Sequence, residues 1–195
     1  MLDAQHRREK VGWFASLAGQ RHWISVNRAP VLTLWAAVVA ERLGFNRAEA
    51  LTLGRAVAGL NAYSKGKSLG IFKPSKGEIT KKRKTLPAAE VIYVDLMGRA
   101  VPTTLCDDGL RAVSKGKPIE PASVERYLEG KFGEAYDDAR AALRSLAKAY
   151  TPQELADHAY GLYTKFRPEI PGGKKGWGAE GRLSLDRIRK LATEV

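Results

Sequence analysis

The most concentrated source of chemistry in this sequence is a run of positive charge between residues 64 and 87. Eight basic residues in this stretch stand against one acidic residue, Glu78, which gives a net charge of +7. A basic side chain that neutralises a phosphate releases condensed counterions whatever the base sequence, so the stretch could hold DNA or RNA non-specifically. The predicted contacts are Lys65, Lys67, Lys73, Lys76, Lys81, Lys82, Arg83 and Lys84. A solvated loop is the alternative, but solubility alone does not require adjacent charges.

A second basic region lies near the C-terminus. Between residues 165 and 190, eight basic residues stand against three acidic ones, a net charge of +5. Trp177 follows Lys174 and Lys175 in the segment Gly-Lys-Lys-Gly-Trp-Gly. An indole on such a loop could stack on an unpaired base or insert at a base step, with the two lysines on phosphates. Packing of Trp177 over the last helix of the chain is at least as good an interpretation.

Residue types used in catalysis and metal binding are present, but their spacing does not support either. His6, His22 and His158 are far apart in the sequence, and there is no His-x-x-x-His or Cys-x-x-Cys pair. Cys106 is followed by two aspartates, which raise a thiol pKa rather than activate the thiol. The acidic residues between 120 and 138 are spaced as on exposed helix faces, and no Walker or dinucleotide glycine pattern occurs. We therefore predict no enzyme activity, no metal and no cofactor.

The overall composition also favours a polyanionic partner. The 195 residues carry 33 Lys and Arg against 21 Asp and Glu, a formal charge of +12. The hydrophobic share of 44% and the charged share of 28% are those of an ordinary globular protein. A single cysteine excludes an internal disulfide framework. With a polar N-terminus and no apolar run near the ~20 residues that span a bilayer, these features predict a cytoplasmic protein that does not interact with membranes.

Helix signals dominate the chain. The helix expected from Pro30 to Leu43 is apolar nearly all round and ends before Gly44, so it should lie at the centre of the core. Asn46 and Glu49 form a capping-box pattern for a helix from Arg47 to about Tyr63. Further helices are expected over residues 4–19, 121–129, 133–150, 152–166 and 184–191, with a capping box at Thr151 and Glu154 and an N-cap at Ser184. A short strand is expected over 22–26, a hairpin over 90–96 and 100–105 with Gly98 in its turn, and a loop over 167–181. Pro102 is expected to put the second strand of the hairpin at a sheet edge.

The segment from Ala40 to Leu53 resembles a helix-turn-helix. It has a small residue at Ala40, where two helices would approach, then Gly44 at the turn and apolar residues that return to the core, namely Phe45, Ala50 and Leu53. With the strand before it and the hairpin after it, residues 4–106 resemble a winged helix-turn-helix DNA-binding domain. This resemblance implies that the second helix enters the major groove and that the hairpin contacts the DNA backbone or the minor groove.

The outward face of that second helix supplies the remaining predicted contacts. These are Arg47, Thr52 and Arg55 on the helix and Arg99 on the hairpin. The same face also carries Leu51. The alternative is a pair of helices packed as an αα-hairpin inside an all-helical core, which predicts that Leu51 is buried.

We therefore expect a mostly α fold with one small antiparallel β-hairpin. Residues 1–106 would form a winged-helix-like part that includes the basic loop 64–87, and residues 107–195 a C-terminal helical bundle, through which the chain could form a homodimer. The predicted function is binding to nucleic acid, double-stranded DNA rather than RNA, as a transcription regulator or nucleoid-type protein dominated by electrostatic contacts. The alternative is a helical adaptor module that docks an acidic protein partner through its basic loop.

Overall fold

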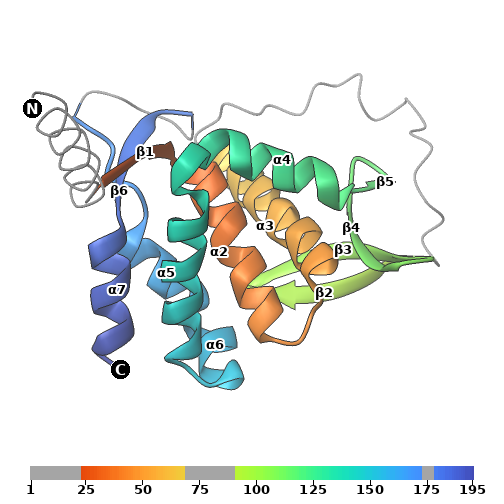
Figure 1. Cartoon of the computed structure of the whole chain (residues 1–195). Helices are drawn as coiled ribbons and strands as arrows, with labels where there is room; N and C mark the ends of the chain where they lie inside the picture. Colours follow the sequence, from red (N-terminus) through yellow and green to blue (C-terminus); the bar gives the residue numbers. More distant parts are fainter. Residues whose placement is uncertain (1–22, 69–90, 173–177) are drawn as a thin grey trace, which may run out of the picture.

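The computed structural model describes residues 23–68, 91–172 and 178–195. The protein is mostly helical, with two small antiparallel sheets (Figure 1). The helix expected over residues 4–19 lies outside the described residues. The elements are β1 (Trp23–Asn27), α2 (Arg28–Arg42), α3 (Arg47–Ser68), β2 (Ile92–Leu96), β3 (Arg99–Cys106), β4 (Gly109–Ser114), β5 (Lys117–Pro118), α4 (Pro121–Phe132), the 3-10 turn η2 (Gly133–Ala135), α5 (Tyr136–Lys148), α6 (Pro152–Phe166), β6 (Glu180–Ser184) and α7 (Leu185–Thr193).

Helix α2 forms the centre of the core, as its nearly unbroken apolar sequence predicts. Every residue from Pro30 to Ala40 is buried, and Figure 1 shows α3, α4, α5 and α6 arranged around the helix. Trp35 joins it to α6: the indole N–H donates to the carbonyl of Ala159 at 2.8 Å, and the ring meets Phe166 edge to face at 5.4 Å. The hydrogen bond satisfies the only polar atom of a fully buried indole.

The start of α3 is the capping box that the sequence predicts, but the helix is longer than expected. The Asn46 N–H donates to the Glu49 carboxylate at 3.0 Å, and the Glu49 N–H donates to the Asn46 side chain at 3.0 Å. The helix then continues to Ser68, five residues beyond Tyr63. Lys65 and Lys67 therefore lie on a helix and not in a loop, which corrects the prediction. One glycine, Gly66, costs a helix only about 1 kcal/mol and does not end it.

Contact between α2 and α3 depends on Gly54. A Cβ atom at this position would lie 2.4 Å from the Thr33 carbonyl oxygen and 2.8 Å from the Ala37 backbone nitrogen. Both distances are far inside normal contact, and both partners are backbone atoms of α2. The two helices can therefore approach this closely only with glycine at residue 54.

Helix α3 is buried on more than one side. Leu51, predicted to face outward in the helix-turn-helix interpretation, is only 2% exposed. Helix α4 and strand β4 pack against α3, in addition to α2. This burial is what the αα-hairpin alternative predicts for Leu51.

The predicted hairpin is confirmed as β2 and β3, and it extends into a sheet of order β2-β3-β4-β5. Its turn places Met97 at φ 53° and Gly98 at φ 70°, the left-handed pair that a tight two-residue hairpin turn requires. The expectation that Pro102 puts its strand at an edge is wrong, because β3 lies between β2 and β4. Pro102 is tolerated because β4 pairs with β3 only from Thr103 onward.

A second sheet joins distant parts of the chain. Strand β1 pairs antiparallel with β6, with Trp23 opposite Ser184, so part of the predicted loop 167–181 is in fact strand. The N-cap of α7 at Ser184 is confirmed, as is the capping box of α6 at Thr151 and Glu154. The predicted boundary at residue 106 falls in the turn between β3 and β4, and residues from both predicted parts share one hydrophobic core. None of the helices in the three described ranges is both long enough and apolar enough to span a bilayer.

The Gly54 contact gives the first prediction. Gly54→Ala should lower the free energy of unfolding by about 3 kcal/mol, because the added methyl group meets backbone atoms that cannot move aside without separating the helices. Gly59→Ala is the matched control: it lies on the same helix, and a Cβ atom there would have nothing within 4 Å. The control should gain roughly 0.5–1 kcal/mol through helix propensity. Urea unfolding of both variants measures this, and equal stabilities would contradict the close-contact argument.

Candidate anion-binding pocket

A polar cavity of about 310 Å³ lies where the start of α2, the end of α3, the start of β3 and the end of α6 meet. Four of its lining residues are basic, and the lining includes no carboxylate. Its other polar groups are hydroxyls and one carboxamide. The lining residues are Arg28, Asn61, Ser64, Lys65, Ser68, Arg99, Tyr160, Tyr163 and Arg167. This arrangement favours an anion, and we call it the anion pocket.

Asn61 holds two of the side chains that line the anion pocket. It is 5% exposed, and its side-chain oxygen accepts from Arg99 Nη2 at 3.0 Å and from the Tyr160 hydroxyl at 3.4 Å. The second terminal nitrogen of Arg99 donates to Ser64 Oγ at 3.3 Å. The guanidinium of Arg99 is thus oriented by the last turns of α3 before any ligand arrives.

Arg28 is fixed on the opposite wall. Its Nε donates to the carbonyl of Pro168 at 3.2 Å, and its own carbonyl accepts from the Tyr163 hydroxyl at 3.2 Å. Burial, and after it repulsion from Arg167, lower the pKa of the Arg28 guanidinium below its ordinary value. Burial also raises the pKa of Tyr163, which keeps its hydroxyl neutral. An anion in the pocket would relieve the repulsion between the two arginines.

The arginines of the anion pocket differ from those on α5. Within the described part of the chain, Arg28, Arg99 and Arg167 form no ion pair with a carboxylate. By contrast, Arg140 and Arg144 of α5 both donate to Glu41 of α2, at 3.3 Å and 2.6 Å.

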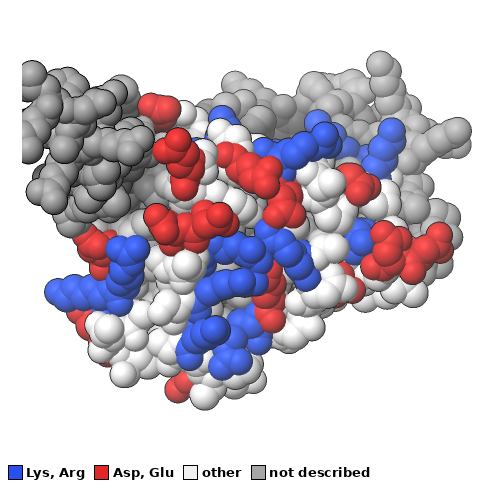
Figure 2. All heavy atoms as spheres, in the orientation of Figure 1, with Lys and Arg blue, Asp and Glu red and all other residues white. Residues whose placement is uncertain are grey.

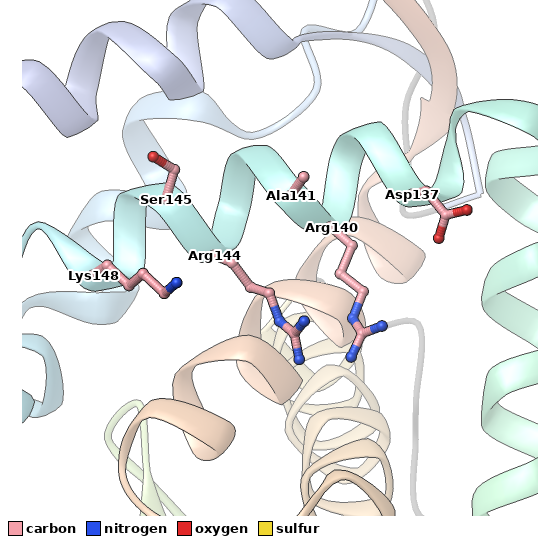
Figure 3. A pocket seen from close by; sticks show the side chains of 6 residues that line it. All are labelled: Asp137, Arg140, Ala141, Arg144, Ser145 and Lys148. Carbon is pink, nitrogen blue, oxygen red and sulfur yellow. The ribbon is translucent and has the colours of Figure 1, made fainter.

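Helix α5 carries a second hollow, of about 390 Å³, which is lined by α5 residues alone. In Figure 3 the arginines of this hollow turn toward α2 and α3. Figure 2 shows basic side chains gathered over α5 and α2, with acidic ones among them. We therefore regard these basic and acidic side chains as a charge network within the protein, in which the carboxylates already neutralise part of the positive charge.

Glu41 is the centre of that network. Its side chain is 16% exposed, and burial by itself would raise its pKa. The hydrogen bond and charge of Arg144, with the charges of Arg140 and Arg47, outweigh burial and hold the pKa of Glu41 below its ordinary value. Arg47 also bonds to Glu125 of α4 and, at 3.2 Å, to the Tyr136 hydroxyl of α5. The network thus connects α2, α3, α4 and α5.

The three predicted contacts on α3 each have a partner within the protein, although Arg55 remains exposed. Arg47 belongs to the Glu41 network, and the guanidinium of Arg55 lies 4.3 Å from the ring centre of Tyr127 on α4. Thr52 is fully buried; its hydroxyl donates to the Glu49 carbonyl and accepts from the Ala112 N–H. A side chain without exposed surface is not placed to contact a base, so Thr52 is not among the contacts that we propose below.

Of the other predicted contacts, the structure brings together Lys65 and Arg99, which both line the anion pocket. Lys67 belongs to α3, and its side chain is not described. The remaining contacts lie outside the described residues: Lys73, Lys76, Lys81, Lys82, Arg83, Lys84, Lys174, Lys175 and Trp177.

Arg28, Asn61 and Tyr160 are among the seven pocket residues that are not predicted as site residues from the sequence. Nothing in the local sequence around any of them indicates a site, because the pocket forms only when α2, α3 and α6 pack together. Arg167 belongs to the second basic region of the sequence, but no pattern distinguishes it from the other basic residues there.

No three His, Cys, Asp or Glu side chains in the described ranges are placed to hold a metal ion. Comparisons with protein-family models, with curated proteins and with solved structures find no match to this chain. Function is therefore inferred from the geometry of the pocket and from the distribution of charge.

The Glu41 network gives the second prediction. Glu41→Gln should lower the free energy of unfolding by about 2 kcal/mol at neutral pH, because it leaves partly buried arginines without their counter-charge. The folded-state pKa of Glu41 is lowered from the ordinary value of 4.5. Its contribution should therefore be complete above that value and be lost as the pH falls through the lower, folded-state pKa.

Unfolding of the wild type and Glu41→Gln across a pH series measures this contribution. Glu129→Gln, an exposed residue of α4, is the control and should match the wild type throughout. A stability difference between wild type and Glu41→Gln that stayed constant down to the lowest pH would contradict the assignment to the Glu41 charge.

Proposed function

We propose that the protein binds nucleic acid, mainly through phosphate groups, and that the anion pocket holds one backbone phosphate. The observation that carries the proposal is the set of three arginines, Arg28, Arg99 and Arg167, that converge on one cavity without a carboxylate partner among the described residues. Partial burial of Arg28 and its repulsion from the exposed Arg167 both disfavour the charged form of Arg28, and an opposite charge compensates both effects. A phosphate supplies that compensation, and the chain's formal charge of +12 favours a polyanion over a single ion.

The hydrogen-bonding groups of the pocket suit a phosphate. A guanidinium presents five N–H donors in a planar fork, and Arg99 uses only two nitrogens in its bonds to Ser64 and Asn61. Because Ser64 Oγ accepts from Arg99, its own hydrogen remains available to donate to a ligand oxygen. Charge-assisted hydrogen bonds of this kind are about twice as strong as neutral ones.

The basic segment of the sequence begins at the same place. Ser68, the last residue of α3, lines the anion pocket. The lysines and arginine of residues 73–84 follow it directly in the chain. We propose that these residues, which lie outside the described ranges, make further phosphate contacts, each of which adds to the salt dependence of binding.

The nucleic-acid contacts that we propose differ from those that the winged-helix resemblance implies. In that arrangement α3 would read the major groove, but Arg47 and Arg55 contact α4 and Thr52 is buried. We propose that contact is made instead at the end of α3 and at the hairpin turn. Arg99 belongs to that turn. The proposal therefore keeps the contact between the hairpin and the DNA backbone, but it does not include base reading by α3.

The third prediction tests the proposed phosphate site. Replacing Arg28 and Arg167 together by glutamine should reduce the slope of log K against log salt by up to roughly 0.7–0.9, the contribution of the one phosphate that the pocket holds. Affinity for random DNA or RNA should fall about 10-fold at low salt, equally for all sequences. Fluorescence anisotropy of labelled oligonucleotides over a salt series measures both quantities.

The matched control replaces Arg126 and Lys131, two exposed residues of α4 that line none of the cavities described above, and removes the same charge. A thermal melt of each variant establishes that it is folded. If the control lost as much affinity as the pocket variant, the phosphate would not be in the pocket. If the wild type bound no random nucleic acid at physiological salt, the proposal would fail and an acidic protein partner would become the better hypothesis.

A further inference from the structure

A second hollow adjoins the anion pocket. This hollow has a volume of about 290 Å³ and lies between the β2–β3 turn and α6. Arg99 and Tyr160 line both cavities, so the two are neighbours on either side of these side chains. The lining residues of the second hollow are Met97, Gly98, Arg99, Ala156, Asp157 and Tyr160. We call the two together the extended groove.

The chemistry of the groove changes from one end to the other. At the anion pocket there are four basic residues and no carboxylate. At the β2–β3 turn Arg99 is the one cation in the lining and Asp157 the one anion, and the rest is apolar, backbone or aromatic. A ligand that matches this gradient is anionic at one end. Its other end is flat and uncharged and carries N–H groups that can donate hydrogen bonds to a carboxylate.

Tyr160 is suited to hold a flat group. It is 38% exposed, although its hydroxyl is tied to the buried Asn61. Its ring also packs near Tyr163, with 6.0 Å between ring centres. The ring is therefore exposed and yet held in place, which lowers the entropy cost of stacking against it.

The turn opposite Tyr160 leaves room for a ligand. Gly98 is exposed, and a Cβ atom at this position would have nothing within 4 Å. Its φ of 70° belongs to the hairpin turn, so the backbone itself forms this wall of the groove. A planar group between Gly98 and Tyr160 meets no side chain from the turn residue.

We propose that the extended groove binds an unpaired nucleotide of a nucleic-acid strand. The phosphate lies at Arg28 and Arg167, and the base stacks on Tyr160. The carboxylate of Asp157 accepts a hydrogen bond from an N–H group on the base edge. This inference rests on the proposed function and adds to it that the bound form is single-stranded. A base inside a duplex is stacked between its neighbours and cannot present a face to Tyr160, whereas an unpaired base can.

The charge of the chain favours a strand over a free nucleotide. One phosphate needs no more than the cations of the anion pocket. The sequence directly after Ser68 adds six further basic residues, from Lys73 to Lys84, against one glutamate. Such a surplus of charge matches a chain of phosphates.

The test uses the full chain and four probes: a mixed-sequence single-stranded DNA, the RNA of the same sequence, a fully abasic strand of the same length and a blunt duplex. We expect the wild type to bind the DNA strand, the RNA strand or both more tightly than the duplex and the abasic strand. Tyr160→Leu should weaken binding to base-containing strands about 10-fold and leave binding to the abasic strand unchanged. Tyr160→Phe keeps the ring and should stay within about 3-fold of the wild type.

Tyr93→Leu is the matched control, since Tyr93 is 66% exposed on β2 and lines neither cavity. An equal loss for the abasic strand in Tyr160→Leu would show a structural role and overturn the inference, as would tighter binding of the duplex. If the Arg28 and Arg167 variant loses affinity while Tyr160→Leu does not, the inference falls and the proposed function stands. If the wild type binds none of the probes, both fall.

Discussion

Gly54 sets the distance between α2 and α3, because any larger residue would place its Cβ atom against the backbone of α2 at Thr33 and Ala37. The consequence reaches beyond these two helices. The chain reverses at Gly44, whose φ of 106° gives a left-handed turn, so α2 and α3 run antiparallel. The first residue of α2 therefore lies beside the last turns of α3. Arg28, Ser64 and Ser68 meet in one pocket for this reason, although more than 30 positions separate Arg28 from the serines.

Helix α6 completes the pocket through two contacts with α2. Trp35 donates to the Ala159 carbonyl near the middle of α6, and the Tyr163 hydroxyl donates to the Arg28 carbonyl one turn later. These bonds fix both the rotation and the position of α6 along its axis. They also decide that Tyr160 and Arg167 face the end of α3. The side chains that would bind a ligand are thus positioned by buried contacts, which explains how cations can be held close together without an ion-pair partner among the described residues.

The fold was predictable where local signals decide it. The caps at Asn46, Thr151 and Ser184, the hairpin turn at Gly98 and the buried character of α2 are all properties of neighbouring residues, and each is confirmed. Strands β4 and β6 escaped prediction because short strands are stabilised by their partners, and the partner of β6 lies more than 150 residues away. The expectation that Pro102 lies on an edge strand failed for a related reason. Only the register between β3 and β4 shows that no hydrogen bond from residue 102 is required.

The candidate site was predictable only in part, and the reason is electrostatic. A count of charges along the sequence does not distinguish Arg47 from Arg99, and both are predicted to contact nucleic acid. In the folded protein Arg47 lies against Glu41 and Glu125, and a cation beside a carboxylate has a field that weakens quickly with distance. Arg99 instead bonds to a neutral carboxamide and a hydroxyl, and its charge remains available to a ligand. Two arginines that look alike in a sequence therefore differ in whether the fold supplies their counter-charge, and only tertiary structure reveals which ones still require an anion.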